Sequence, residues 1–143
     1  AEEFEFDIVI YATGFDAFTG SLLKPEITGR AGQTLKQKWA DGPISQLGLA
    51  TAGFPNLFII VGPGSPSLLA NVLLSSEDQV DWLTDLFVKA RDEGISEVEA
   101  TAEAERAWGE YVNERAKETL YMQTPSFYNG ADGTLCRGGL FGL

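Results

Sequence analysis

The sequence contains no histidine and a single cysteine, Cys136, among its 143 residues. Without histidine, the usual zinc sites and every Ser-His or Cys-His catalytic pair are excluded, and one cysteine cannot form an intrachain disulfide. Basic residues are also scarce, because 10 Lys and Arg stand against 21 Asp and Glu and give a net charge of −11. This excess of negative charge argues against nucleic acid or an anionic membrane as a partner.

Long apolar runs are absent as well. No segment approaches the roughly 18 apolar residues of a membrane helix, and no signal peptide opens the chain, so we expect a cytoplasmic protein without membrane contact. The 44% of apolar residues suffice for the core of one domain. Residues 1–7 lead directly into an apolar run, and residues 138–143 are glycine-rich and apolar without a polar tail. Both ends therefore predict a fragment of a larger protein.

The central stretch is an apolar run followed by a turn. Residues 57–61 read Leu-Phe-Ile-Ile-Val, and residues 62–67 read Gly-Pro-Gly-Ser-Pro-Ser. The pattern predicts a strand buried on both faces, a tight turn and then a helix. In open α/β sheets, ligands bind beyond the carboxyl ends of such strands, where a helix N-terminus offers N–H groups. We therefore expect the chemistry here.

The rest of the pattern predicts an α/β fold. A continuous apolar centre predicts a second interior strand over residues 6–11. Helical spacing predicts helices over residues 69–93 and 102–120, with Gly94 ending the first and Thr101 capping the second. Ser75 and Asp78 have capping-box spacing and offer a second start for the first helix. Three aromatic residues on the apolar stripes of these helices are interpreted as core residues: Trp82, Trp108 and Tyr111.

The turn only superficially resembles a dinucleotide-binding fingerprint. Its third glycine is replaced by Ser67, and Pro63 and Pro66 remove two N–H donors from a loop that would need them. Two interpretations remain open from spacing alone. The loop is either a rigid wall beside a flat, preformed ligand or a rigid connector between a strand and a helix.

Several motifs together carry a family resemblance. Residues 7–16 read Asp-Ile-Val-Ile-Tyr-Ala-Thr-Gly-Phe-Asp, and their Ala-Thr-Gly turn is similar to a signature of flavoprotein monooxygenases. With residues 62–71, residues 77–82, and Trp108 ahead of residues 111–114, the chain resembles the carboxy-terminal part of Baeyer-Villiger monooxygenases from about residue 5 to residue 127. Residues 124–129 further resemble the branch that acts on large cyclic ketones and steroids.

The resemblance implies a fold and an activity. Residues 1–120 would form the carboxy-terminal part of a Rossmann-like FAD-binding domain, with a helical segment, in a flavoprotein with two dinucleotide-binding domains. Residues 121–143 would form a loop on the NADP and active-site side. The whole enzyme would use FAD, NADPH and O₂ to insert one oxygen atom beside a ketone carbonyl, which gives an ester or lactone. The missing amino-terminal portion would supply the rest of the site, so no residue here is assigned a catalytic role and the chain alone is expected to be inactive.

The resemblance also assigns binding residues by position. Those expected beside FAD are Thr13, Gly14, Asp16, Asn71 and the backbone N–H of Val72. Those expected to line the substrate cavity are Ser67, Leu68 and Leu69. Phe127 matches a position on the NADP side that is often Trp in the family, so any hydrogen bond from an indole N–H is lost here.

Two other functions stay open. A nitrogen- or sulfur-oxygenating flavin monooxygenase would share the Ala-Thr-Gly turn. A non-catalytic acidic module could instead bind a partner through the aromatic stretch near the carboxy terminus, which the net charge and the missing catalytic residues would allow.

Overall fold

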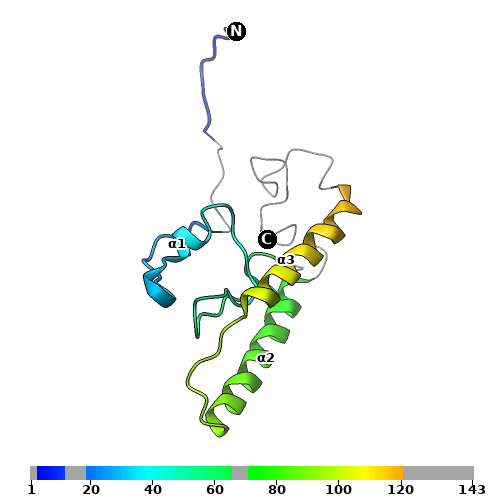
Figure 1. The fold of residues 1–143 in the computed structure, drawn as a ribbon. Helices are drawn as coiled ribbons and strands as arrows, with labels where there is room; N and C mark the ends of the chain where they lie inside the picture. The colour runs from blue at the N-terminus through cyan, green and yellow to red at the C-terminus, as the bar shows by residue number, and fades with distance from the viewer. Residues whose placement is uncertain (1–2, 12–18, 66–70, 121–143) are drawn as a thin grey trace.

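The computed structural model describes residues 3–11, 19–65 and 71–120 and consists there of helices and ordered loops. A 3₁₀ turn, η1 (Arg30–Gly32), and a short helix, α1 (Leu35–Lys38), precede two long helices, α2 (Val72–Asp92) and α3 (Ala102–Lys117). Figure 1 shows the loops of residues 40–65 between α1 and the long helices, and an amino-terminal tail that projects away from them.

The ends of α2 are set by local signals. Asn71 is the N-cap residue, and its side chain accepts hydrogen bonds from the N–H groups of Leu73 and Leu74. At the other end, Gly94 has a positive φ of 68°, and the N–H of Ile95 donates to the carbonyl of Ala90 at 2.7 Å. This is the Schellman arrangement that glycine favours, so the predicted stop at Gly94 is confirmed. The helix begins at Val72, and residues 69 and 70 of the predicted helix lie outside the described part.

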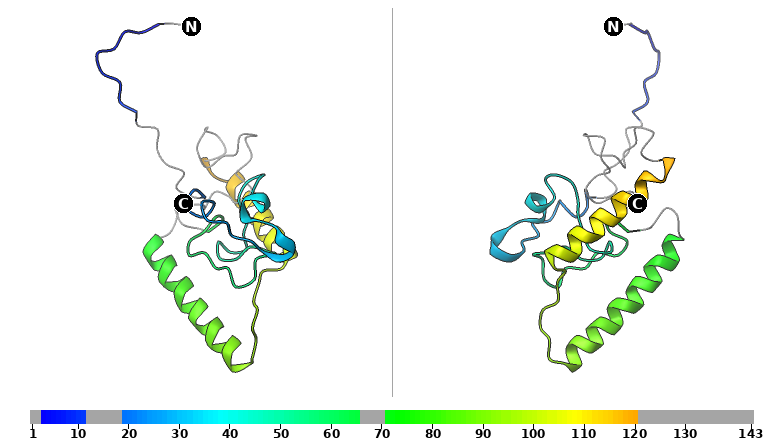
Figure 2. Two further views of the ribbon diagram at one scale, coloured as in Figure 1. Left: turned by 90° about the vertical axis from the view of Figure 1, so that its left-hand side faces the viewer. Right: turned by 45° about the vertical axis from the view of Figure 1, so that its right-hand side comes forward.

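The predicted cap of α3 is also confirmed. The side chain of Thr101 accepts a hydrogen bond from the N–H of Ala104 at 3.1 Å. Helix α3 ends at Lys117, three residues before the predicted end at residue 120. The connector of residues 93–101 returns from the far end of α2 to the start of α3, so the two helices run in roughly opposite directions (Figure 2).

Both predicted strands are wrong within the described residues, which contain only isolated bridges between single residue pairs. Residues 6–11 form no ladder, and their side chains are exposed, for example Ile10 at 83%. A strand needs a neighbour to pair its backbone groups, and no described residue forms a bridge with this tail. Over residues 57–61, only Phe58 makes a bridge, to Ala50, and Val61 has a positive φ of 50° that ends any extended run. The predicted α/β architecture is thus not present in the described part of this chain.

The core lies in the loop region. Leu35, Trp39, Phe54 and Ile59 form its buried centre. Partly buried apolar side chains surround them: Leu22, Leu23, Ile27, Ile44 and Leu57. Helix α2 packs on the loop through a perpendicular contact between the rings of Phe58 and Phe87, whose centroids lie 5.5 Å apart. The loops, not a sheet, therefore carry the packing that supports the two long helices.

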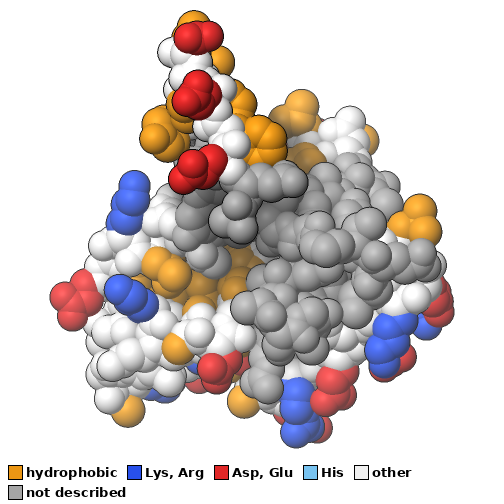
Figure 3. Space-filling view, turned by 90° about the horizontal axis from the view of Figure 1, so that it is seen from above, with side chains coloured by type: hydrophobic (Ala, Val, Ile, Leu, Met, Phe, Trp, Pro, Cys, Tyr) orange, Lys and Arg blue, Asp and Glu red, His pale blue; other side chains and the backbone are white. Residues whose placement is uncertain are grey.

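Large apolar surfaces remain exposed. Along α2 they include Leu73, Leu74, Val80, Trp82, Phe87 and Val88. Trp82 is half exposed and Tyr111 is 55% exposed, so the interpretation of both as core residues is wrong within this chain. The tail presents apolar side chains beside acidic ones (Figure 3). No helix in the described ranges is both long enough and apolar enough to cross a membrane.

Candidate functional site

Two of the predicted site residues, Asn71 and Val72, lie in the described part of the chain. The others lie outside the described residues: Thr13, Gly14, Asp16, Ser67, Leu68, Leu69 and Phe127. The site can therefore be built from its two described borders. These borders are the turn of residues 62–65 and the N-terminus of α2.

The N-terminus of α2 is exposed and lacks acidic side chains. Asn71 caps it by accepting from Leu73 and Leu74, at 3.0 Å and 3.4 Å between nitrogen and oxygen. As the first helical residue, Val72 has no partner for its N–H inside the helix. The first turn of α2 holds no acidic residue, whereas that of α3 holds Glu103 and Glu105. The partial positive charge at this end of α2 is therefore not offset by its own first turn.

Residues 62–65 form the tight turn that the sequence predicts. The N–H of Ser65 donates to the carbonyl of Gly62 at 3.1 Å. Pro63 occupies the second position of the turn and Gly64, with φ of 83°, the third, which is the residue preference of a type II turn. All four residues are buried. The turn is thus a fixed part of the structure and not a surface loop.

Ser45 and Gly48 hold the turn from the loop side. The hydroxyl of Ser45 donates to the carbonyl of Pro63 and accepts from the N–H of Gly48. The N–H of Gly62 donates to the carbonyl of Gly48 at 2.9 Å. Gly48 has φ of 72°, and a Cβ there would lie 2.5 Å from the Cβ of Ser65. Only glycine allows this close approach.

The two long helices also hold this turn. The N–H of Val61 donates to the side-chain oxygen of Gln79 on α2 at 2.7 Å. The indole N–H of Trp108 on α3 donates to the carbonyl of Gly64 at 3.0 Å. Helix α3 is in turn fixed by Glu105, whose carboxylate accepts from Lys38 at 2.8 Å and from the N–H of Ala52 at 2.9 Å. Three separate parts of the chain thus hold one short turn.

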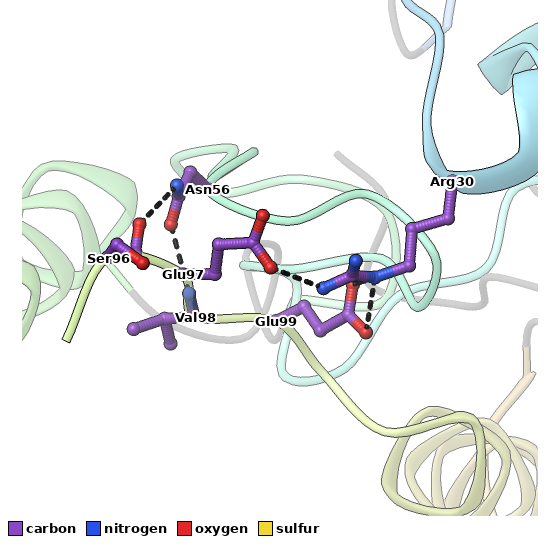
Figure 4. Close-up of polar contacts among 6 residues, drawn as sticks. All are labelled: Arg30, Asn56, Ser96, Glu97, Val98 and Glu99. Atoms are coloured by element: carbon purple, nitrogen blue, oxygen red, sulfur yellow. Dashed lines mark hydrogen bonds and ion pairs between the residues drawn. The ribbon is translucent and has the colours of Figure 1, made fainter.

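A second polar cluster fastens the connector between the helices. Arg30 pairs with Glu97 and Glu99 at 2.8 Å and 3.0 Å, and the side chain of Asn56 bonds the backbone of Ser96 and Val98 (Figure 4). Hydrogen bonds to Glu97 and then Glu99 raise the pKa of Arg30 above its usual value.

The cluster borders an open hollow of about 410 Å³ between residues 27–30 and 54–57. Because two carboxylates already face Arg30, this hollow is not a suitable anion site.

Gln79, Ser45 and Glu105 were missed by the sequence interpretation, and Trp108 was taken only as a core residue. Gln79 and Trp108 do lie within the motifs that carry the family resemblance, which was the available signal. Gln79 lies 18 positions from its partner Val61, and Trp108 lies 44 positions from its partner Gly64. Such long-range contacts with backbone groups leave no periodic pattern.

The chain is similar to known proteins over most of its length. No family model matches the chain. It is 42% identical over 131 residues, 92% of its length, to a Baeyer-Villiger monooxygenase of Pseudooceanicola batsensis. It is also 42% identical to a cyclopentanone 1,2-monooxygenase of a Comamonas species over 130 residues, and to a phenazine N-monooxygenase of Lysobacter antibioticus over 128 residues. The chain spans about 24% of the length of the first two of these relatives.

Solved structures agree. An oxidized steroid monooxygenase bound to NADP is 48% identical to this chain, with a TM-score of 0.78 over 90% of it. A second structure, of OTEMO in complex with FAD and NADP, is 36% identical with a TM-score of 0.81. Each match covers about a quarter of the solved chain, 25% and 26%. These findings confirm the resemblance to Baeyer-Villiger monooxygenases that the sequence motifs predicted.

Proposed function

We propose that this chain, a relative of one segment of Baeyer-Villiger monooxygenases, supplies one wall of the active site in an enzyme of that activity. The enzyme would insert one oxygen atom from O₂ beside a ketone carbonyl and give an ester or lactone, with FAD and NADPH as cofactors. The observation that carries this proposal is 42% identity over 92% of the chain to a Baeyer-Villiger monooxygenase. The matched part of the chain includes both described borders of the site, the turn of residues 62–65 and the N-terminus of α2.

The N-terminus of α2 has the character that a flavin would require. When bound, FAD would supply the redox chemistry, and negative charge gathers on the pyrimidine end of the reduced flavin. The N–H of Val72, which has no partner inside the helix, and the positive end of the helix dipole, with no acidic residue in the first turn, favour an anionic group there. Asn71 would stand beside this group, while its side-chain oxygen keeps the helix capped. The residues present therefore fit the cofactor.

The remaining assignments form part of the same proposal. Thr13, Gly14 and Asp16 would border FAD, and Phe127 would contact NADP through its ring alone. Ser67, Leu68 and Leu69 would line the ketone side. Residues 1–120 would complete a Rossmann-like FAD domain together with sheet strands from the rest of the protein, and residues 121–143 would lie on the NADP side.

The test uses the full-length protein that carries this chain. We expect flavin absorbance in the purified protein, NADPH consumption that rises with cyclohexanone or a steroid ketone, and a product one oxygen atom heavier than the ketone. A colourless, stably folded protein that consumes no NADPH would overturn the proposal and favour a non-catalytic binding module.

A second candidate function is nitrogen oxygenation. It is favoured by one observation, the 42% identity to the Lysobacter antibioticus phenazine N-monooxygenase over 90% of this chain. The same assay separates the two functions when phenazine and a simple sulfide are offered beside the ketones. An N-oxide or sulfoxide as the product, without a lactone, would move the assignment.

A further inference from the structure

We propose that Gln79 and Trp108 are positioning residues that fix Val61 and the turn of residues 62–65 relative to the N-terminus of α2. This inference rests on the proposed function, because the purpose of the positioning is to hold Asn71 and Val72 at the flavin. Neither side chain is itself placed against FAD or the ketone. Both act through the backbone of the turn.

The bond from Val61 to Gln79 joins the turn to the helix that follows it. Gln79 lies about two turns after the start of α2, and its oxygen accepts from the N–H of Val61 at 2.7 Å. Val61 has φ of 50°, a left-handed conformation that a β-branched residue rarely adopts. A strained residue keeps this conformation only when its surroundings impose it. The hydrogen bond to Gln79 is one such constraint, and it also fixes how far α2 stands from the turn.

The bond from Trp108 comes from the other long helix. Its indole N–H donates to the carbonyl of Gly64 at 3.0 Å, and Gly64 is buried with φ of 83°. One turn earlier on α3, Glu105 is 3% exposed and is bonded to Lys38 and Ala52. Trp108 is therefore presented to the turn from a helix that is itself held in place. A buried carbonyl without its donor would be costly, so the bond determines where Gly64 lies.

These two bonds act on one short piece of chain from two directions. The bond to Gln79 sets the distance between the turn and α2, and the bond from Trp108 sets the distance between the turn and α3. Asn71 and Val72 begin α2 only a few residues after the turn. A small displacement of a positioned group can reduce catalytic efficiency by orders of magnitude, so these bonds would matter for binding as well as for folding.

The test compares four variants of the full-length protein. Gln79→Leu removes the acceptor, Gln79→Glu keeps an acceptor oxygen, and Trp108→Phe removes the indole N–H but keeps a ring. Trp82→Phe is the matched control, since Trp82 is half exposed on α2. Five quantities are measured: FAD affinity by titration of the apoprotein, KM and kcat for cyclohexanone, the unfolding temperature, and hydrogen exchange of the Val61 amide.

We expect Gln79→Leu and Trp108→Phe to weaken FAD affinity and raise KM by about tenfold or more, with a smaller change in kcat. Gln79→Glu and Trp82→Phe should stay close to the parent. The Val61 amide should exchange faster in Gln79→Leu but not in Trp82→Phe.

Two kinds of result would overturn the inference. A lower unfolding temperature with unchanged FAD affinity and KM would show a purely structural role. Equal effects of Gln79→Glu and Gln79→Leu, or of Trp82→Phe and Trp108→Phe, would show that the two hydrogen bonds are not the cause. A parent protein that binds no FAD and converts no ketone would instead refute the proposed function itself, before any variant is compared.

Discussion

The carboxylate of Glu105 on α3 lies 2.8 Å from the ammonium group of Lys38 on α1 and is almost completely buried. Its second oxygen accepts from the N–H of Ala52, so one side chain joins a helix, a short helix and the core loop. Because this ion pair is buried, removing one partner is destabilising, since the other is left as a charge without its counter-charge. The pair therefore fixes α3, and through α3 the donor Trp108.

Replacing Glu105 should destabilise the fold strongly. We expect Glu105→Ala to lower the free energy of unfolding by about 3 kcal/mol, because the Lys38 ammonium and the Ala52 N–H both lose their acceptor. Glu105→Gln should cost less, since its amide oxygen can still accept from Ala52. Urea denaturation measures both. Arg106→Gln, at a neighbouring residue in an exposed pair with Glu110, serves as the control and should change stability by less than about 1 kcal/mol. Equal losses for Glu105→Ala and Arg106→Gln would contradict this account.

Gly48 should tolerate no side chain. A Cβ would lie 2.5 Å from Cβ of Ser65 and 2.9 Å from its backbone nitrogen, so Gly48→Ala must displace the turn. Gly94→Ala is the matched control, because Gly94 also has a positive φ but has no atom within 4 Å of its would-be Cβ. The control should cost about 1 kcal/mol, for backbone strain alone, and Gly48→Ala clearly more. Unfolding free energies that match in the two variants would show that the close approach is unimportant.

The helices could be predicted because their signals are local. The cap at Thr101 and the stop at Gly94 each involve residues within one helical turn, and both were confirmed. The strands could not, since a strand depends on a distant partner. Residues 6–11 have the composition of an interior strand, but their apolar side chains are exposed and form no ladder.

The candidate site was predicted only in part for a similar reason. Family motifs assign Asn71 and Val72 by position, and the structure locates both at the start of α2. They say nothing of the bonds from Gln79 and Trp108 to backbone groups, which depend on how two helices pack against one turn. The positive φ of Val61 is equally invisible in a run of five apolar residues.

The acid side of the stability profile should respond to Glu114. Its hydrogen bond to Lys117 lowers the pKa of the Glu114 carboxyl below its usual value of 4.5. A depressed carboxyl pKa adds stability at pH values above the unfolded pKa, and this stability is lost as the pH falls through the folded pKa. Glu114→Gln should therefore lower the unfolding temperature slightly at neutral pH and have no effect in strong acid. Glu110→Gln, in a longer contact of 3.7 Å with Arg106, is the control. A difference that grows as the pH falls would contradict the sign of this effect.

The exposed apolar surface predicts self-association of the isolated chain. The tail of residues 3–11 and the exposed residues of α2 leave large apolar side chains in water, including Ile8 at 78% and Leu73 at 75% exposure. Patches of this kind are uncommon on monomeric proteins. We expect the isolated chain to bind a hydrophobic dye and to scatter light as oligomers, and Ile8→Ser combined with Leu73→Ser to reduce both. The matched control replaces one exposed polar residue of the tail and one of α2, Glu5→Ser and Glu77→Ser. A dye-negative monomer at high concentration would contradict the expectation.

Val61 offers a test of backbone strain beside the candidate site. Its φ of 50° is unfavourable for a β-branched residue but acceptable for asparagine. Val61→Asn should therefore raise the free energy of unfolding by about 1 kcal/mol or leave it unchanged, although valine to asparagine normally destabilises. Val112→Asn is the control, because Val112 is 2% exposed within α3 and has no such strain, and it should cost at least about 2 kcal/mol. Thermal unfolding and urea titration measure both variants. If Val61→Asn destabilises as much as Val112→Asn, the left-handed conformation of Val61 is not a source of strain. The hydrogen bond from its N–H to Gln79 would then contribute less to positioning the turn than the geometry indicates.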